Sequence, residues 1–106
     1  MTDLRLASIG ECMIEMRKTG PASFEMGFGG DSANTAIYAA RLLAGTAHKV
    51  EYITALGDDP YSDQMRAFLA AENVGLNHSG RLEGRMPGLY FIETNDVGER
   101  SFHYYR

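Results

Sequence analysis

Apolar and polar residues alternate near the start of the chain, and this period of two predicts a strand over Leu4–Ile9. Cys12–Met16 and Phe24–Phe28 are similarly β-prone, and the residues between them, 19–23, are typical of a turn. We therefore expect three strands in this part of the chain, the second and third joined by a turn.

The period changes abruptly after Gly30. Apolar residues then recur at helical spacing and form one narrow stripe, in which alanine predominates. Asp31 or Ser32 is the expected N-cap, because either side chain can accept from the first free backbone N–H groups. Gly45 is the expected stop. The stripe consists of Ala33, Ala36, Ile37, Ala40 and Leu43.

A second unit of strand and helix follows. Val50–Leu56 is rich in β-prone residues and predicts one strand. Asp59 as N-cap and Pro60 at the first helical position are a strong signal for a helix start, and residues 73–75 end this helix. Strands and helices thus alternate, which predicts an α/β fold with parallel strands and right-handed crossovers.

The last stretch of the chain predicts a hairpin instead. Gly88–Thr94 and Glu99–Tyr105 are both aromatic and β-prone, and turn residues connect them. A three-residue loop over 96–98, with Gly98 in the left-handed conformation, pairs Asn95 with the residue after the loop. We expect this hairpin to form a small β-flap beside the α/β core.

The register of the hairpin decides which side chains share a face. Tyr90 lies opposite Tyr104, and Arg106 follows two residues later on the same face. An arginine beside two phenols can hold a carboxylate through paired, charge-assisted hydrogen bonds. A solvated arginine on an aromatic sheet face is the alternative that these residues leave open.

The glycine-rich stretch before the first helix, residues 27–34, is the second candidate site. Adjacent glycines let a ligand approach the backbone, and the free N–H groups of a helix start favour negative charge or hydroxyl oxygens. Asp31 and Asn34 add polar groups that suit a polyol. A tight turn with a capped helix explains the same residues without a ligand. A dinucleotide site is a weaker alternative, because Ser32 takes the place of the last glycine of that fingerprint.

Composition narrows the classes of partner. The net charge is −4, so no basic surface indicates nucleic acid or an anionic membrane. The apolar stretches are far too short to span a bilayer. The single cysteine, Cys12, cannot form an internal disulfide, which fits a reducing compartment. We expect a cytoplasmic protein with one small domain, and the three scattered histidines predict no metal site.

Taken together, these strings resemble the amino-terminal part of the PfkB (ribokinase-like) family of carbohydrate kinases over essentially all 106 residues. The string G-G-D-S-A-N-T of residues 29–35 is a good marker of the family. G-L-Y at 88–90 and Y-Y-R at 104–106 point within it to kinases of acidic keto sugars. The resemblance implies part of a ribokinase-like α/β domain over 1–106, with lid strands near 12–28 and 88–106. The matching strings are residues 9–15, 27–35, 52–57, 87–94 and 98–106.

The resemblance also implies an activity, the transfer of the γ-phosphoryl group of ATP, with Mg²⁺, to the terminal hydroxyl of 2-keto-3-deoxygluconate. Arg106 would face the substrate carboxylate, and family members often pair through the flap, so a homo-oligomer is expected. The sugar contacts implied by position are Gly30, Asp31, Ser32, Ala33 and Asn34 at the helix start, and Tyr90, Tyr104 and Arg106 in the lid.

The transfer machinery is the missing part. The family's base and anion cradle come from a carboxyl-proximal motif resembling D-T-x-G-A-G-D, and no string of the 106 residues matches it. No catalytic base, ATP ligand or Mg²⁺ ligand is therefore assigned, and the 106-residue chain alone is expected to be inactive. A non-catalytic sugar-acid-binding or dimerisation fragment of the same fold stays open as an alternative. The sequence does not distinguish a substrate of the gluconate series from one of the galactonate series.

Overall fold

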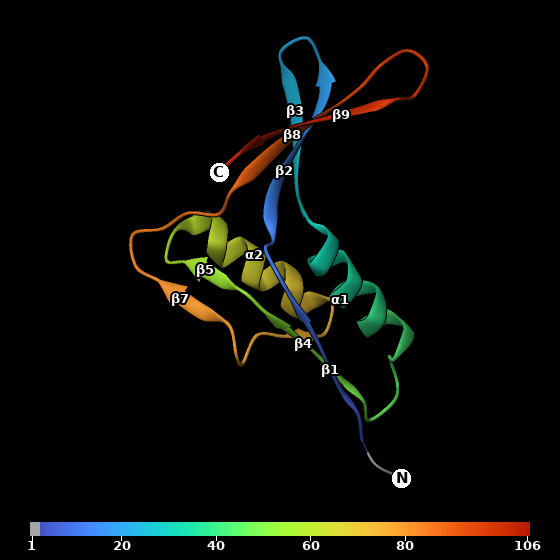
Figure 1. Cartoon of the computed structure of the whole chain (residues 1–106), viewed down its shortest axis with the longest axis vertical. Helices are drawn as coiled ribbons and strands as arrows, with labels where there is room; N and C mark the ends of the chain where they lie inside the picture. The colour runs from blue at the N-terminus through green and yellow to red at the C-terminus, as the bar shows by residue number, and fades with distance from the viewer. Residues whose placement is uncertain (1–2) are drawn as a thin grey trace.

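The computed structural model describes residues 3–106 and has a core and a projecting flap (Figure 1). The core sheet consists of the parallel strands β1 (Arg5–Ile9), β4 (Lys49–Ile53) and β6 (Val74–Gly75), in that order. Helices α1 (Asp31–Leu42) and α2 (Pro60–Ala71) connect these strands and pack against them. The predicted α/β fold with parallel strands is confirmed.

Four strands in the order β3-β2-β8-β9 form the flap. The hairpin of β2 (Met13–Gly20) and β3 (Ser23–Gly29) joins the hairpin of β8 (Leu89–Thr94) and β9 (Arg100–Tyr105), because β2 and β8 pair in parallel. Figure 1 shows the flap extending away from the two helices, with the tips of its two hairpins spread apart. Segments far apart in sequence are thereby held in one sheet.

The strand predicted over Val50–Leu56 is wrong in its extent. It divides at Thr54 into β4 and β5 (Ala55–Gly57), and β5 pairs with β7 (Gly80–Leu82) in a separate two-stranded sheet. Gly80 donates its N–H to the Thr54 carbonyl at 2.8 Å, so the chain leaves the core sheet at this residue. Strands β6 and β7 were not predicted, because two or three residues are too few to show a period.

The predicted N-cap of α1 is also wrong. The capping residue is Gly30, with φ 131° and ψ 148°, and no side chain caps the helix. Those angles are open essentially only to glycine, and a Cβ there would lie 2.7 Å from the Glu11 carbonyl oxygen. Asp31 instead lies inside the first turn, where its charge complements the helix dipole. The Ser32 hydroxyl is turned inward to the Tyr52 hydroxyl, at 2.7 Å.

Other predicted signals are confirmed. Asp59 caps α2 by accepting from the N–H groups of Tyr61 and Ser62, with Pro60 at the first position. In the second flap hairpin, Gly98 has φ 85° and the Asn95 N–H donates to the Glu99 carbonyl at 2.9 Å. The resulting register pairs Tyr90 with Tyr104.

Besides a small flap cluster of Met13, Tyr90 and Ile92, one main hydrophobic core lies beneath the helices. It includes Tyr52, Met65 and Leu69, and the Phe28 ring of the flap packs against Phe68 of α2 at 5.4 Å between centroids. Cys12 is buried in this core, and burial raises the pKa of its thiol to about 12, so it is a small apolar residue here. Within residues 3–106, neither helix combines the length and the apolar character that crossing a bilayer requires. The buried part of the α1 stripe is Ala33, Ala36, Ile37 and Ala40, with Leu43 partly buried against it.

Candidate functional site

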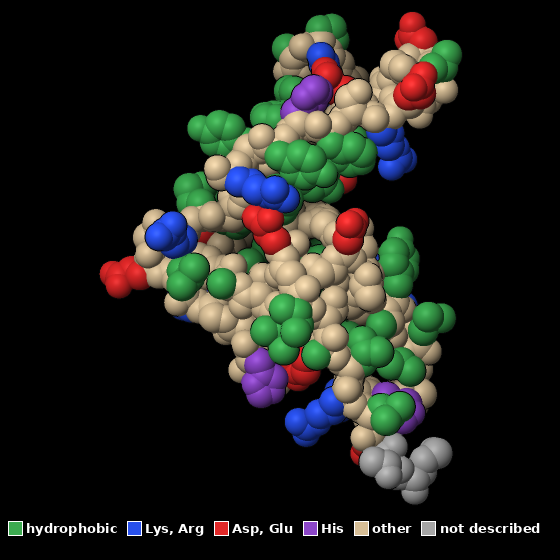
Figure 2. All heavy atoms as spheres, in the orientation of Figure 1, with side chains coloured by type: hydrophobic (Ala, Val, Ile, Leu, Met, Phe, Trp, Pro, Cys, Tyr) green, Lys and Arg blue, Asp and Glu red, His purple; other side chains and the backbone are tan. Residues whose placement is uncertain are grey.

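A cavity of about 440 Å³ opens between the flap and the start of α1. Figure 2 shows acidic and basic side chains side by side where the flap meets the core. The lining comes from three parts of the chain: residues 11–15, residues 30–34 at the start of α1, and the second flap hairpin with Arg106 directly after it. Seven of the eight residues predicted for the sugar site are in it: Gly30, Asp31, Ser32, Asn34, Tyr90, Tyr104 and Arg106.

The start of α1 forms the polar floor of the cavity. The side chains of Asp31 and Asn34 are exposed there, whereas the Ser32 hydroxyl is engaged by Tyr52. Ala33 is the exception among the predicted residues, because it does not line the cavity and its methyl group is buried in the core. Asp31 and Asn34 are thus the side chains of this turn that are best able to meet hydroxyl groups.

The wall of the cavity is built on a hydrogen bond within the flap. The Tyr90 hydroxyl donates to the Glu15 carboxylate at 2.8 Å. Burial and this bond raise the pKa of Tyr90, so the phenol stays neutral and keeps donating. A Cβ at Gly29 would lie 2.4 Å from the Tyr90 oxygen, so the glycine leaves room for the ring. Tyr90 is therefore a positioning residue for Glu15.

The rim of the cavity carries a cation. The Arg106 guanidinium lies 4.9 Å from the centre of the Tyr104 ring, and its Nε lies 3.2 Å from Glu11 Oε1. Tyr104 is more than half exposed, so the guanidinium that lies on its ring remains accessible to a ligand. This arrangement can receive an anionic group at the edge of the cavity.

Three further charged residues line the cavity and were not assigned from the sequence. They are Glu11, Glu15 and Arg100. Alternation along a strand could have indicated them, because residues an even number of positions apart share a face of a strand. Glu11 and Glu15 are four residues apart, and Arg100 is six residues from Arg106. The break between β1 and β2 hid the first pair, since regular alternation could not be assumed there.

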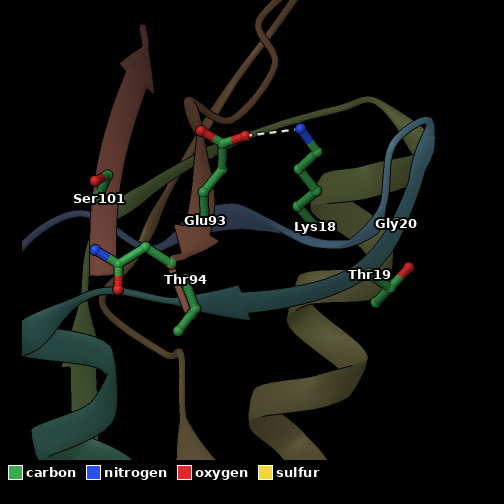
Figure 3. A pocket seen from close by; sticks show the side chains of 7 residues that line it. Lys18, Thr19, Gly20, Glu93, Thr94 and Ser101 are labelled. Carbon is green, nitrogen blue, oxygen red and sulfur yellow. Dashed lines mark hydrogen bonds and ion pairs between the residues drawn. The ribbon is translucent and has the colours of Figure 1, made fainter. Parts of the chain in front are cut away.

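A different cavity of about 480 Å³ lies near the hairpin tips of the flap (Figure 3). Its cation is already neutralised, because Lys18 Nζ lies 2.9 Å from Glu93 Oε1 and His103 lies 3.5 Å from the other oxygen of that carboxylate. Its lining shares no residue with the cavity at the helix start. The cavity at the helix start is therefore the stronger candidate for a functional site.

Comparison with known proteins identifies the family of this chain. Residues 3–106 match the pfkB family carbohydrate kinase family.

The chain belongs to this family.

Within the pfkB family, the chain is similar to 2-dehydro-3-deoxygluconokinase of Escherichia coli K12, with 49% identity over 102 residues, which cover 96% of the chain and 33% of the relative. The enzyme of that name from Dickeya dadantii is 48% identical over 106 residues, covering 100% and 34%. The crystal structure of fructokinase with bound ATP from Xylella fastidiosa superposes with a TM-score of 0.79 at 30% identity, covering 99% of the chain and 34% of the fructokinase. The chain thus spans about a third of the length of the curated relatives it matches.

Proposed function

We propose that this chain is the sugar-binding segment of a cytoplasmic kinase that transfers the γ-phosphoryl group of ATP to the terminal hydroxyl of 2-keto-3-deoxygluconate. The observation that carries the proposal is the position of Arg106 at the rim of the same cavity that the start of α1 floors. A neutral sugar needs no such cation, whereas a sugar acid does. The names of the relatives from E. coli and D. dadantii point to the same substrate.

Each part of the cavity has a separate role in this proposal. Asp31 and Asn34 would bind the hydroxyl groups, aided by the N-terminal dipole of α1. Glu15, oriented by Tyr90, would accept from a further hydroxyl. Arg106 would bind the carboxylate and thereby fix which end of the chain-like substrate faces the flap.

ATP and Mg²⁺ would be bound outside these residues. Across residues 3–106, no group of three or more His, Cys, Asp or Glu side chains could hold a metal ion. We therefore assign neither the ion nor the nucleotide to particular residues of this segment. ATP supplies the phosphoryl group; the segment described above orients the acceptor.

The proposal predicts a preference for the acid in the intact protein that carries this segment. In a coupled assay of ADP formation, we expect kcat/KM for 2-keto-3-deoxygluconate to exceed that for fructose and ribose by at least about 100-fold, because a neutral sugar has no carboxylate that Arg106 could bind and orient. Residues 1–106 alone should show no turnover. Faster turnover of a neutral sugar would contradict the proposed substrate. Binding of the acid by the intact protein without phosphorylation would favour the non-catalytic alternative.

We further propose that two copies of the protein associate through their flaps. The outer strands β3 and β9 each have one partner strand in the flap, and aromatic side chains such as Phe24 and Tyr105 are exposed on it. Light scattering on the intact protein should give the mass of a dimer or larger assembly at micromolar concentration. Tyr105→Glu should weaken the association by about 10-fold or more, because it places a charge in an apolar contact. A monomeric wild type would refute this.

A further inference from the structure

The Arg106 guanidinium already has a counter-ion when the cavity is empty. Its Nε lies 3.2 Å from Glu11 Oε1, and both side chains are about half exposed, at 60% and 49%. Glu11 also belongs to the base of the site, because its carbonyl oxygen lies against Gly30, the cap of α1. The ion pair therefore links the end of the flap to the floor of the cavity.

The same ion pair separates two hollows. Glu11 and Arg106 line the cavity at the helix start and also an adjacent cavity of about 400 Å³ on their other side. This second hollow is mainly apolar, and the remaining lining is Met86, Pro87, Gly88, Leu89 and Tyr105. The pair is thus the partition between the polar sugar cavity and an apolar neighbour.

The backbone at Gly88 is shaped to admit this pair. A Cβ there would lie 3.0 Å from Glu11 Oε2 and 3.3 Å from Arg106 Cγ. A larger residue would press on both partners at once. The contact is therefore packed into the base of the flap as well as held by charge.

The charge of a ligand decides whether it can replace Glu11 as the partner of Arg106. A carboxylate that takes Arg106 exchanges one ion pair for another, so the guanidinium is never left unpaired. A neutral ligand offers no replacement, and Arg106 then stays with Glu11. Because half-exposed ion pairs contribute little free energy, a well-placed carboxylate can compete with Glu11.

We propose that Glu11 is the internal counter-ion that holds Arg106 at the rim until the substrate carboxylate displaces it, and that it thereby lowers the preference of the site for acids. The inference rests on the proposed function, since it takes a sugar acid as the ligand. Glu11 is then an anion of the protein that competes with the substrate carboxylate for Arg106. Glu11 should therefore weaken the binding of acids while leaving neutral ligands nearly unaffected.

The test is calorimetric titration of the intact protein, without ATP, with 2-keto-3-deoxygluconate and with its neutral methyl ester. Glu11→Gln keeps the shape of the side chain and removes its charge. At low ionic strength we expect this variant to bind the acid about two- to fivefold more tightly than wild type, the range of an exposed ion pair. The affinity for the ester should stay unchanged. Glu83→Gln is the matched control, because Glu83 is exposed and lines neither cavity, and it should bind both ligands as wild type does.

Salt gives a second readout that a purely structural role would not move. In wild type the exchange conserves one ion pair, whereas in Glu11→Gln the ligand meets an unpaired cation. The acid affinity of the variant should therefore fall more steeply with added salt. Glu11→Ser covers the case in which the glutamine amide binds Arg106 in place of the carboxylate. This variant should show the same tighter binding of the acid and the same steeper salt dependence.

The outcomes separate this inference from the proposed function. Tighter acid binding by Glu11→Gln, with a steeper salt dependence, supports it. Weaker binding of acid and ester alike would make Glu11 a direct ligand of the sugar, and unchanged binding would make it a bystander; either result overturns the inference while the proposed substrate stands. A wild type that binds the ester but not the acid overturns both.

Discussion

Replacing Arg106 with leucine should reduce the affinity of the intact protein for 2-keto-3-deoxygluconate by about 10- to 150-fold, corresponding to about 1.5–3 kcal/mol for hydrogen bonds to a charged group. The half-exposed position of the guanidinium on the Tyr104 ring keeps the expected loss below that of a fully buried pair. Arg106→Lys should fall between wild type and Arg106→Leu, because an ammonium keeps the charge but loses the planar fork. Titration of the three proteins measures the series.

The methyl ester of the substrate is the control for this series. It lacks the carboxylate charge, so Arg106→Leu should change its affinity much less. Equal losses for acid and ester would mean that Arg106 supports the structure of the cavity instead of binding the carboxylate.

Gly30→Ala should impair both the fold and the site. The angles φ 131° and ψ 148° belong to a region open essentially only to glycine, which costs other residues about 1–3 kcal/mol. The added methyl group would also lie 2.7 Å from the Glu11 carbonyl oxygen, a backbone atom that cannot swing aside. We expect thermal unfolding at a lower temperature and a kcat/KM lowered by about 100-fold, since the start of α1 would shift relative to the flap.

Gly84→Ala is the matched control for Gly30→Ala. Gly84 also has a positive φ, of 69°, but a Cβ there would meet no atom within 4 Å. It should lower stability by about 1–2 kcal/mol through backbone strain alone and leave turnover unchanged. If Gly30→Ala kept full turnover, the start of α1 would not be part of the site.

Local signals predicted the fold wherever a short stretch decides its own conformation. Asp59 with Pro60 marked the start of α2, and Gly98 marked the bulge that sets the register of β8 and β9. The start of α1 was misassigned because Asp31 and Ser32 are good caps by residue type. A tertiary contact decides the capping residue instead, because the close approach of the Glu11 carbonyl requires a glycine at the capping position.

Contacts between distant segments account for what the sequence did not predict. The break at Thr54 depends on residues 79 and 80, and β6 and β7 exist only because β4 and β5 are already in place to pair with them. In the site, alternation placed Tyr90, Tyr104 and Arg106 on one face. It could not show that Glu15 accepts from Tyr90, because β2 and β8 are adjacent only in the folded flap.

The three-residue loop of the second flap hairpin has a consequence for how this protein can change over generations. Side chains of a strand alternate between its two faces, so one added or deleted residue between Asn95 and Glu99 would turn Tyr104 and Arg106 away from the cavity. Substitutions of Asp96 and Val97 are tolerable, whereas Gly98 has a φ of 85° that disfavours other residues. Paired insertions preserve the face, but a single-codon insertion exchanges the cationic face for Ser101, His103 and Tyr105. The proposed preference for an acidic substrate would thus be inherited partly through the length of a loop that lies outside the cavity.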